Sequence, residues 1–181
     1  MENYWNILEQ SLVRATQAMD RQSFGLERSG HDIAILRERV YCYELYHRLR
    51  LCLPDGEEFP FVLHGEVDKR GHHLLESLVG PRNPDFIVHK PGVQGDEANL
   101  AVVEVKSGRN VGTGLEKDAK TLVAFVERAD YFRGVHLVFG GNHDVVRARI
   151  REAYSDVAQR EQLAVFWHPE AGRAAQRLGD W

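Results

Sequence analysis

The sequence predicts a single α/β domain, and three observations support this fold class. Apolar residues recur at helical spacing in four segments, while alternating or continuous runs of strand-forming residues fill five others. These segments follow one another through the 181 residues without a repeat, a low-complexity stretch or a linker. The composition, 43% hydrophobic and 28% charged, is that of an ordinary globular protein. A chain of this length buries enough surface to fold without disulfides or a structural metal.

Two helices are expected near the N-terminus. Apolar residues from Trp5 onward recur at helical spacing and predict an amphipathic helix over residues 3–20. The stretch SFGLERSGHD then interrupts this pattern. Asp32 is predicted to cap a second helix, which runs to about Leu51 and stops at the following Pro-Asp-Gly turn.

Three strands and one short helical piece are expected in the middle of the chain. Residues 61–68 suit a strand, and residues 72–78 suit a short helix. Two clearer strands, 85–90 and 100–107, are separated by PGVQGDEAN, whose proline and glycines favour turns. These two strands are therefore predicted to pair as a hairpin.

Helices and strands alternate in the last third of the chain, after a glycine-rich loop. The expected elements are a helix over 115–126, a strand over 135–139, a helix from Asn142 or Asp144 to about Gln159, and a strand over 163–167. The tail AGRAAQRLGDW is polar, and no clear structure is predicted for it.

Charge and hydropathy exclude several classes of protein. The net charge of −4 argues against binding nucleic acid by bulk electrostatics, although the acidic excess is confined to residues 54–110. No basic start precedes an apolar run, and no segment approaches the ~18 apolar residues of a membrane span. A cytoplasmic protein with no membrane partner is expected. Cys42 and Cys52 lie about 15 Å apart in one predicted helix, too far for a disulfide, and are expected to be packing thiols.

Two charged residues interrupt the apolar strand NLAVVEVKSG. Because side chains alternate between the two faces of a strand, Glu104 and Lys106 point the same way. Buried charges cost several kcal/mol unless they are paired or bound to metal. Asp85 begins the preceding strand, and antiparallel pairing could bring it beside Glu104. Two plainer interpretations stay open: a structural salt bridge between Glu104 and Lys106, and a simple turn at the Pro-Asp pair ending at Asp85.

Taken together, the Pro-Asp pair ending at Asp85 and the tripeptide Glu104-Val105-Lys106 resemble the PD-(D/E)xK motif of the restriction-endonuclease-like nuclease superfamily. The predicted order helix, three strands, helix, strand (αβββαβ) is similar to the core of that superfamily over residues 33–140. The resemblance implies a central mixed sheet flanked by helices, with an extra N-terminal helix and a C-terminal helix and strand. The segments ERVYCYELYHRLR, GLEKDAKTLVAF and RGVHLVFG look like stand-alone members found in bacterial defence loci.

The resemblance also implies a magnesium site. Asp85, Glu104 and the backbone carbonyl of Val105 would be ligands of Mg²⁺, which Mn²⁺ could replace, because Mg²⁺ prefers hard oxygen donors. Lys106 would orient the attacking water and stabilise the transition state; whether it also accepts a proton is left open. The first core helix of the superfamily often contributes a further acid, and Glu44 is the residue expected in that role.

Alternatives remain for the peripheral site residues. Glu44 could simply pair with an arginine one turn on, and Glu66 on the first strand is a competing third carboxylate. Lys120, on the helix after the site, is expected to contact a substrate phosphate, with Lys117 and Asp118 as less favoured candidates. A solvated helix face is the plainer explanation for all three.

The expected function is a Mg²⁺-dependent endonuclease that hydrolyses phosphodiester bonds, with DNA as substrate, in a bacterial defence or restriction setting. A ribonuclease, or a non-catalytic nucleic-acid-binding or scaffold subunit, is the alternative. Expected partners are nucleic acid, a second copy of the chain, or other subunits of a defence system. The sequence contains no P-loop, dinucleotide fingerprint, zinc-ligand spacing or serine-hydrolase elbow.

Overall fold

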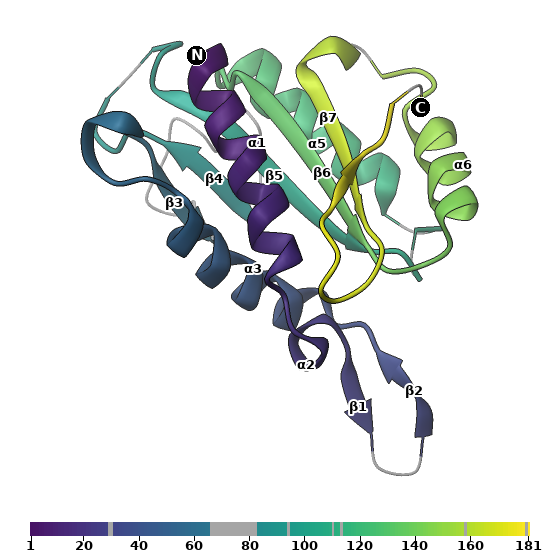
Figure 1. Cartoon of the computed structure of the whole chain (residues 1–181). Helices are drawn as coiled ribbons and strands as arrows, with labels where there is room; N and C mark the ends of the chain where they lie inside the picture. Colours follow the sequence, from purple (N-terminus) through teal and green to yellow (C-terminus); the bar gives the residue numbers. More distant parts are fainter. Residues whose placement is uncertain are drawn as a thin grey trace.

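A six-stranded sheet forms the centre of the molecule, and helices cover both of its faces (Figure 1). The structure is a computed structural model that describes residues 1–28, 31–65, 83–93, 95–109, 111–112, 114–157, 159–179 and 181. The predicted α/β class and the flanked central sheet are confirmed.

The sheet is mixed. Its strands, in spatial order, are β3 (Val62–Gly65), β4 (Phe86–His89), β5 (Asn99–Ser107), β6 (Arg133–Phe139), β7 (Leu163–His168) and β8 (Gln176–Arg177). The pairs β3–β4 and β4–β5 are antiparallel, and the pairs β5–β6 and β6–β7 are parallel. Strand β8 pairs with β7 in the antiparallel sense at the edge of the sheet. The predicted hairpin is therefore the β4–β5 pair.

Each face of the sheet is buried under its own pair of helices. Helices α1 (Glu2–Gln17) and α3 (Glu38–Cys52) share one apolar core with the side chains of Val103 and Val105. Helices α5 (Leu115–Arg128) and α6 (His143–Ala153) share the other core, which includes Val102 of the same strand. Alternate side chains of β5 thus enter opposite cores, as the strand period requires.

Shorter elements connect and extend these layers. They are α2 (Arg21–Phe24), the two-stranded hairpin of β1 (Leu26–Arg28) and β2 (His31–Ile35), and 3-10 turns at Gly56–Glu58 and Arg160–Gln162. The β1–β2 hairpin extends away from the layered body (Figure 1). In the part of the chain that the structure describes, the order α3, β3, β4, β5, α5, β6 matches the predicted order of helix, three strands, helix and strand.

The predicted start of the second helix is wrong. Asp32 lies in strand β2, and α3 begins six residues later at Glu38 without a side-chain cap at Arg37. The segment HDIAI contains two isoleucines, and β-branched residues favour strands. The strand propensity of this segment therefore outweighs the preference of Asp32 for capping a helix.

The end of α6 and the structure of the C-terminal tail also differ from the prediction. Asn142 does cap α6, since its side chain accepts hydrogen bonds from the amides of Asp144 and Val145, but the helix ends at Ala153 instead of reaching Gln159. Gln159 has a positive φ of 57°, which is incompatible with a continuing helix. The tail, for which no structure was predicted, contributes β8.

Two predictions fall partly or wholly outside the described residues. The strand expected over 61–68 is present as Val62–Gly65, and its last three residues are not described. The short helix expected over 72–78 lies entirely outside the described residues. Cys42 and Cys52 are both free, as predicted. Across the described ranges, none of the helices combines the length and apolar character that crossing a bilayer requires.

Two glycine backbones touch where β5 and β6 end. A Cβ atom added to Gly108 would lie 2.1 Å from the carbonyl oxygen of Gly140, and the Gly108 amide donates a hydrogen bond to the carbonyl of Phe139 at 2.7 Å. Because no side chain fits there, the last residues of β5 are held directly against the end of β6.

Candidate active site

The β4–β5 hairpin places Asp85 opposite Glu104. Phe86 pairs with Val103 and Ile87 with Val102, so continuing this antiparallel register by one residue sets Asp85 against Glu104. Directly opposed residues in such a pair have Cβ atoms about 5 Å apart. The Val105 amide also donates a 2.7 Å hydrogen bond to Oδ2 of Asp85. Asp85 therefore lies beside the part of β5 that carries Glu104 and Lys106.

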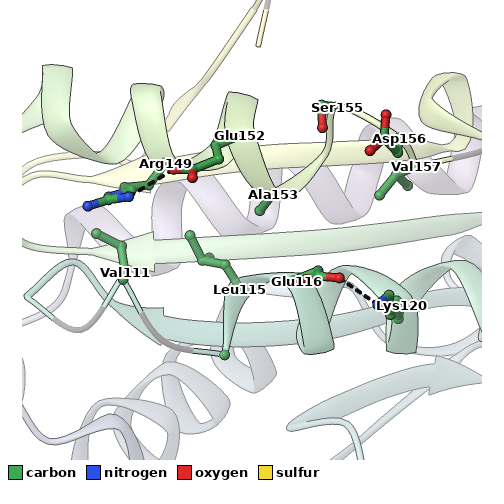
Figure 2. A pocket seen from close by; sticks show the side chains of 12 residues that line it. Val111, Leu115, Glu116, Lys120, Arg149, Glu152, Ala153, Ser155, Asp156 and Val157 are labelled. Atoms are coloured by element: carbon green, nitrogen blue, oxygen red, sulfur yellow. Dashed lines mark hydrogen bonds and ion pairs between the residues drawn. The ribbon is translucent and has the colours of Figure 1, made fainter.

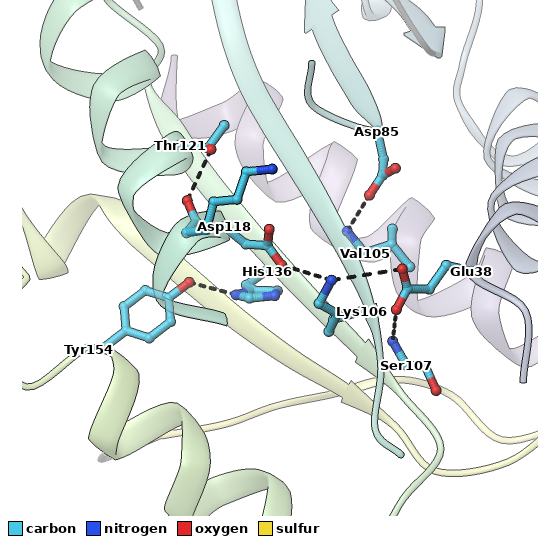
Figure 3. Close-up of polar contacts among 10 residues, drawn as sticks. Glu38, Asp85, Val105, Lys106, Ser107, Asp118, Thr121, His136 and Tyr154 are labelled. Atoms are coloured by element: carbon cyan, nitrogen blue, oxygen red, sulfur yellow. Dashed lines mark hydrogen bonds and ion pairs between the residues drawn. The ribbon is translucent and has the colours of Figure 1, made fainter. Parts of the chain in front are cut away.

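Lys106 lies between two further carboxylates (Figure 3). Its Nζ is 3.3 Å from Oδ2 of Asp118 on α5 and 3.8 Å from Oε2 of Glu38 at the start of α3. The buried Oδ2 of Asp118 accepts no hydrogen bond of normal geometry, so the contact with Lys106 is an ion pair. Lys106 thus links helices from both faces of the sheet at one end of β5.

Glu38 is the acid that the first core helix brings to this cluster, and the sequence analysis missed it. Its Oε1 accepts a 3.0 Å hydrogen bond from the amide of Ser107, which fixes the carboxylate at the end of β5. Glu38 precedes Cys42, Leu45 and Leu49 at helical spacing, and those three residues belong to the buried face of α3. With the helix start placed correctly, this spacing would have identified Glu38.

The structure does not bring Glu44 to the cluster. Its Oε1 accepts a 2.5 Å hydrogen bond from Nε of Arg48 one turn along α3, the simple pairing that was the alternative interpretation. Glu66, the competing acid, lies outside the described residues. Val105, whose carbonyl was the predicted third ligand, is paired with Leu137 in the β5–β6 ladder.

Lys120 lines a second cavity, beside α5 and α6. Its Nζ donates a 2.5 Å hydrogen bond to Oε1 of Glu116, and both side chains are exposed. They line a cavity of about 400 Å³ between α5 and the end of α6, together with the Arg149–Glu152 ion pair (Figure 2). Of the three α5 residues considered from the sequence, Asp118, one of the two less favoured, is the residue that contacts Lys106.

Burial and neighbouring charges shift the pKa values of the acids in the cluster. Burial raises the pKa of Asp85 to about 6; the Val105 amide and Lys106 oppose this shift, whereas Glu38 and Asp118 add to it. Burial also raises the pKa of Asp118, against the effect of Lys106. Four acids (Glu38, Asp85, Glu104 and Asp118) surround one ammonium, so negative charge is in excess.

The same acids keep Lys106 charged. Burial acts to lower the pKa of Lys106, but Asp118, Glu38 and Glu104 outweigh it, and the pKa is raised above its ordinary value. Lys106 is therefore an ammonium group at neutral pH. In this protonated form Lys106 can stabilise negative charge and donate hydrogen bonds.

A buried histidine lies beside Glu104 on the neighbouring strand. His136 is the ladder partner of Glu104 in the β5–β6 pair, and its Nδ1 shares a 2.7 Å hydrogen bond with the hydroxyl of Tyr154. Burial, with a contribution from Lys106, lowers the pKa of His136 to about 3, so the imidazole is neutral. Its Nε2 is buried and has no hydrogen-bond partner.

The donors present suit a hard divalent cation, although they are not a complete set of side-chain ligands. Over the described ranges, no group of three or more His, Cys, Asp or Glu side chains is placed to hold a metal ion. Mg²⁺ needs few protein ligands because it usually keeps several waters. The raised pKa of Asp85 and the excess of carboxylates are electrostatic costs that a bound cation would relieve.

A cavity of about 580 Å³ adjoins the acids. It is lined by residues of α3, by the end of β3 and by the start of β4, namely Glu38, Arg39, Cys42, Tyr43, Tyr46, His64, Gly65, Asp85 and Phe86. Two of the cluster's acids, Glu38 and Asp85, are part of its wall. The candidate site therefore opens into a space large enough for a small ligand.

No protein-family model, curated protein or solved structure matches the chain.

Proposed function

We propose that this protein is a Mg²⁺-dependent nuclease whose centre is formed by Asp85, Glu104 and Lys106. The observation that carries this proposal is the hydrogen bond from the amide of Val105, the residue between Glu104 and Lys106, to the carboxylate of Asp85. The PD-(D/E)xK-like motif and the order of the core elements agree with it.

Each residue has a role that follows from its surroundings. Asp85 and Glu104 would hold the cation through their carboxylate oxygens. When bound, Mg²⁺ would supply Lewis-acid stabilisation of the phosphate and a water of lowered pKa. Lys106, held as an ammonium by Asp118 and Glu38, would donate hydrogen bonds to the charge that develops on the phosphate oxygens.

Glu38 would position the catalytic groups, because it contacts both the backbone and a side chain of β5. Its two oxygens contact different groups, the amide of Ser107 and the ammonium of Lys106. Glu38 therefore fixes both the backbone and the side chain at the end of β5. It takes the place that the sequence analysis gave to Glu44 as the acid from the first core helix.

Cleavage of defined substrates tests the proposal. The wild-type chain should convert supercoiled plasmid, single-stranded DNA or RNA to shorter products with Mg²⁺ or Mn²⁺, and none of them with EDTA. Glu104→Gln and Lys106→Ala should each reduce the rate by about 100-fold or more, the range seen when one transition-state contact is removed. DNA is the expected substrate, and the RNA arm decides between DNA and RNA.

An exposed α5 residue provides a matched control. Glu116→Gln makes the same chemical change as Glu104→Gln outside the cluster and should cleave like the wild type. Equal rates for Glu104→Gln and Glu116→Gln would show that the assigned site is wrong. Binding of nucleic acid without cleavage under any metal condition would instead favour the non-catalytic subunit.

A further inference from the structure

We infer that the cavity beside Asp85 binds an unpaired nucleobase, so that the preferred substrate is a single strand or an unpaired end. This inference rests on the proposed function, and it names the substrate class of the same site. Three features of the cavity support it: its position, its aromatic side chains and the distribution of its charges.

The cavity is continuous with the acids that would act on the phosphodiester. Glu38 and Asp85 belong both to the cluster and to the cavity wall. A nucleotide whose phosphate lay at a cation held by the cluster would have its sugar and base close to the cavity, and the volume of about 580 Å³ is sufficient for one base. Position alone therefore favours the nucleotide next to the cleaved bond as the occupant.

Two aromatic side chains on one side of α3 line this cavity. Arg39, Tyr43 and Tyr46 are spaced by four and three residues, and all three line the cavity. Tyr46 is fixed, because its hydroxyl donates a 3.3 Å hydrogen bond to the carbonyl of Leu63 and its ring stacks on Phe86. Tyr43 is 60% exposed, which is unusual for a large aromatic side chain.

An aromatic platform beside a cation is the arrangement that binds single-stranded nucleic acid. Bases stack on exposed aromatic rings whatever their sequence, and a nearby arginine attracts the backbone. Tyr43 provides such a ring and Arg39 such a charge. The carboxylates of Glu38 and Asp85 repel a phosphate, so the uncharged base is the part of a nucleotide that suits the cavity interior.

Pairing excludes a base from this space. A base in a duplex is stacked above and below and paired at its edge, so it can enter a cavity only after leaving the helix, at a cost of a few kcal/mol. A single strand or a frayed end pays less of this cost. The cavity therefore predicts tighter binding of single strands than of duplexes with the same sequence.

Binding of fluorescent oligonucleotides tests the inference without any cleavage. The full chain is titrated at low salt in EDTA against a labelled 20-mer, as single strand and as duplex, in DNA and RNA forms, and Kd is obtained from anisotropy. Tyr43→Ala should weaken binding of the single strand about tenfold, the loss expected from one stacking contact, and Tyr43→Trp should retain it. In a strand that carries 2-aminopurine, the fluorescence of this base should be quenched when the wild type binds and not when Tyr43→Ala is added.

Leu51→Ala is the matched control. Leu51 is on the same helix and is 68% exposed, but it does not line the cavity, so its Kd should stay within twofold of the wild type. Thermal unfolding of each variant shows whether the fold is intact. Equal binding by Tyr43→Ala and Leu51→Ala, an equal loss on duplex and single strand, or no single-strand binding by the wild type would each overturn the inference.

The two proposals can fail separately. Cleavage that depends on Glu104 while Tyr43→Ala binds normally would retain the nuclease and remove the base site. Single-strand binding that depends on Tyr43, with no cleavage under any metal condition, would retain the base site and remove the nuclease.

Discussion

Asp85 is the residue whose environment most clearly conflicts with stability. Its carboxylate is largely buried, near two other acids, and its pKa of about 6 lies above the ordinary value of 3.8. At neutral pH the folded protein therefore holds an ionised carboxylate that is less favourable than the same group in water. Such residues cluster at functional sites, where the cost is tolerated for the sake of chemistry.

Replacing Asp85 by asparagine should therefore stabilise the protein while removing function. The folded pKa is raised, so the stability associated with the protonated acid is full below about pH 4 and is lost as the pH rises to about 6. In EDTA, Asp85→Asn should match the wild type near pH 4 and exceed it by about 3 kcal/mol at pH 7.5. Urea unfolding at pH 4, 5, 6 and 7.5 measures this difference.

The asparagine oxygen can still accept the hydrogen bond from Val105, which makes Asp85→Asn a conservative change. Asp96, exposed between β4 and β5, supplies the control for the chemical change: Asp96→Asn should leave the free energy of unfolding within about 0.5 kcal/mol of the wild type. A variant of Asp85 that is less stable than the wild type at pH 7.5 would contradict the electrostatic account of the site.

At the scale of elements, the candidate site is a junction between the end of β5 and the start of α3. Strand β5 supplies Glu104 and Lys106, and the first residue of α3 binds both the ammonium of Lys106 and the amide of Ser107. Directly beyond Ser107, Gly108 lies against Gly140 at the end of β6. The position of Lys106 therefore depends on backbone packing as well as on ion pairs.

Adding one methyl group at Gly108 should disturb this junction. In Gly108→Ala the new Cβ would lie 2.1 Å from the carbonyl oxygen of Gly140, so the backbone must move. Overpacking of this kind costs about 1–3 kcal/mol of unfolding free energy, and cleavage should fall because Lys106 moves with the strand. Denaturant unfolding and the plasmid assay measure the two effects.

Gly112→Ala is the comparison within the same loop. A Cβ at Gly112 would meet nothing within 4 Å, so its unfolding free energy should stay within about 0.5 kcal/mol of the wild type. If the two alanine variants had equal stability and equal activity, the close approach of β5 and β6 would have no functional importance.

At the scale of the whole molecule, the parts that sequence could predict are those governed by local pattern. Alternation along NLAVVEVKSG placed Glu104 and Lys106 on one face, and the turn residues before it predicted the hairpin that brings Asp85 opposite. The helices α1 and α5 and the strands β4 to β7 follow from the same periodicities.

The parts that sequence could not predict depend on tertiary contacts or on competing local signals. Asp32 looked like a helix cap, and the resulting shift of α3 directed attention to Glu44 instead of Glu38. The pairing of Lys106 with Asp118 requires α5 to cross β5, which no local pattern specifies. The cavity beside Asp85 exists because three separate elements meet there.

Cation binding should stabilise the whole molecule, because the excess acids are distributed over α3, β4, β5 and α5. At 100 times its Kd, Mg²⁺ would add about 2.7 kcal/mol to the free energy of unfolding, which corresponds to roughly 5–10 °C in Tm for a chain of this size. The shift should be smaller at pH 5 than at pH 7.5, since Asp85 must lose its proton to bind.

Differential scanning fluorimetry with and without Mg²⁺ measures this shift directly. Glu104→Gln should abolish most of it, and Glu116→Gln, outside the cluster, should leave it unchanged. Identical Tm values for the wild type with Mg²⁺ and with EDTA would argue that the described acids hold no such ion at working concentrations.

The surplus of carboxylates around Lys106 also links metal binding to substrate binding in the proposed reaction. A polyanion that approached the empty cluster would meet like charge, whereas one that approached after the cation would meet a local field of reduced or reversed sign. Binding of a single strand, measurable through the cavity in EDTA at low salt, would therefore tighten when Mg²⁺ is present, so the supply of free Mg²⁺ would control affinity as well as bond cleavage.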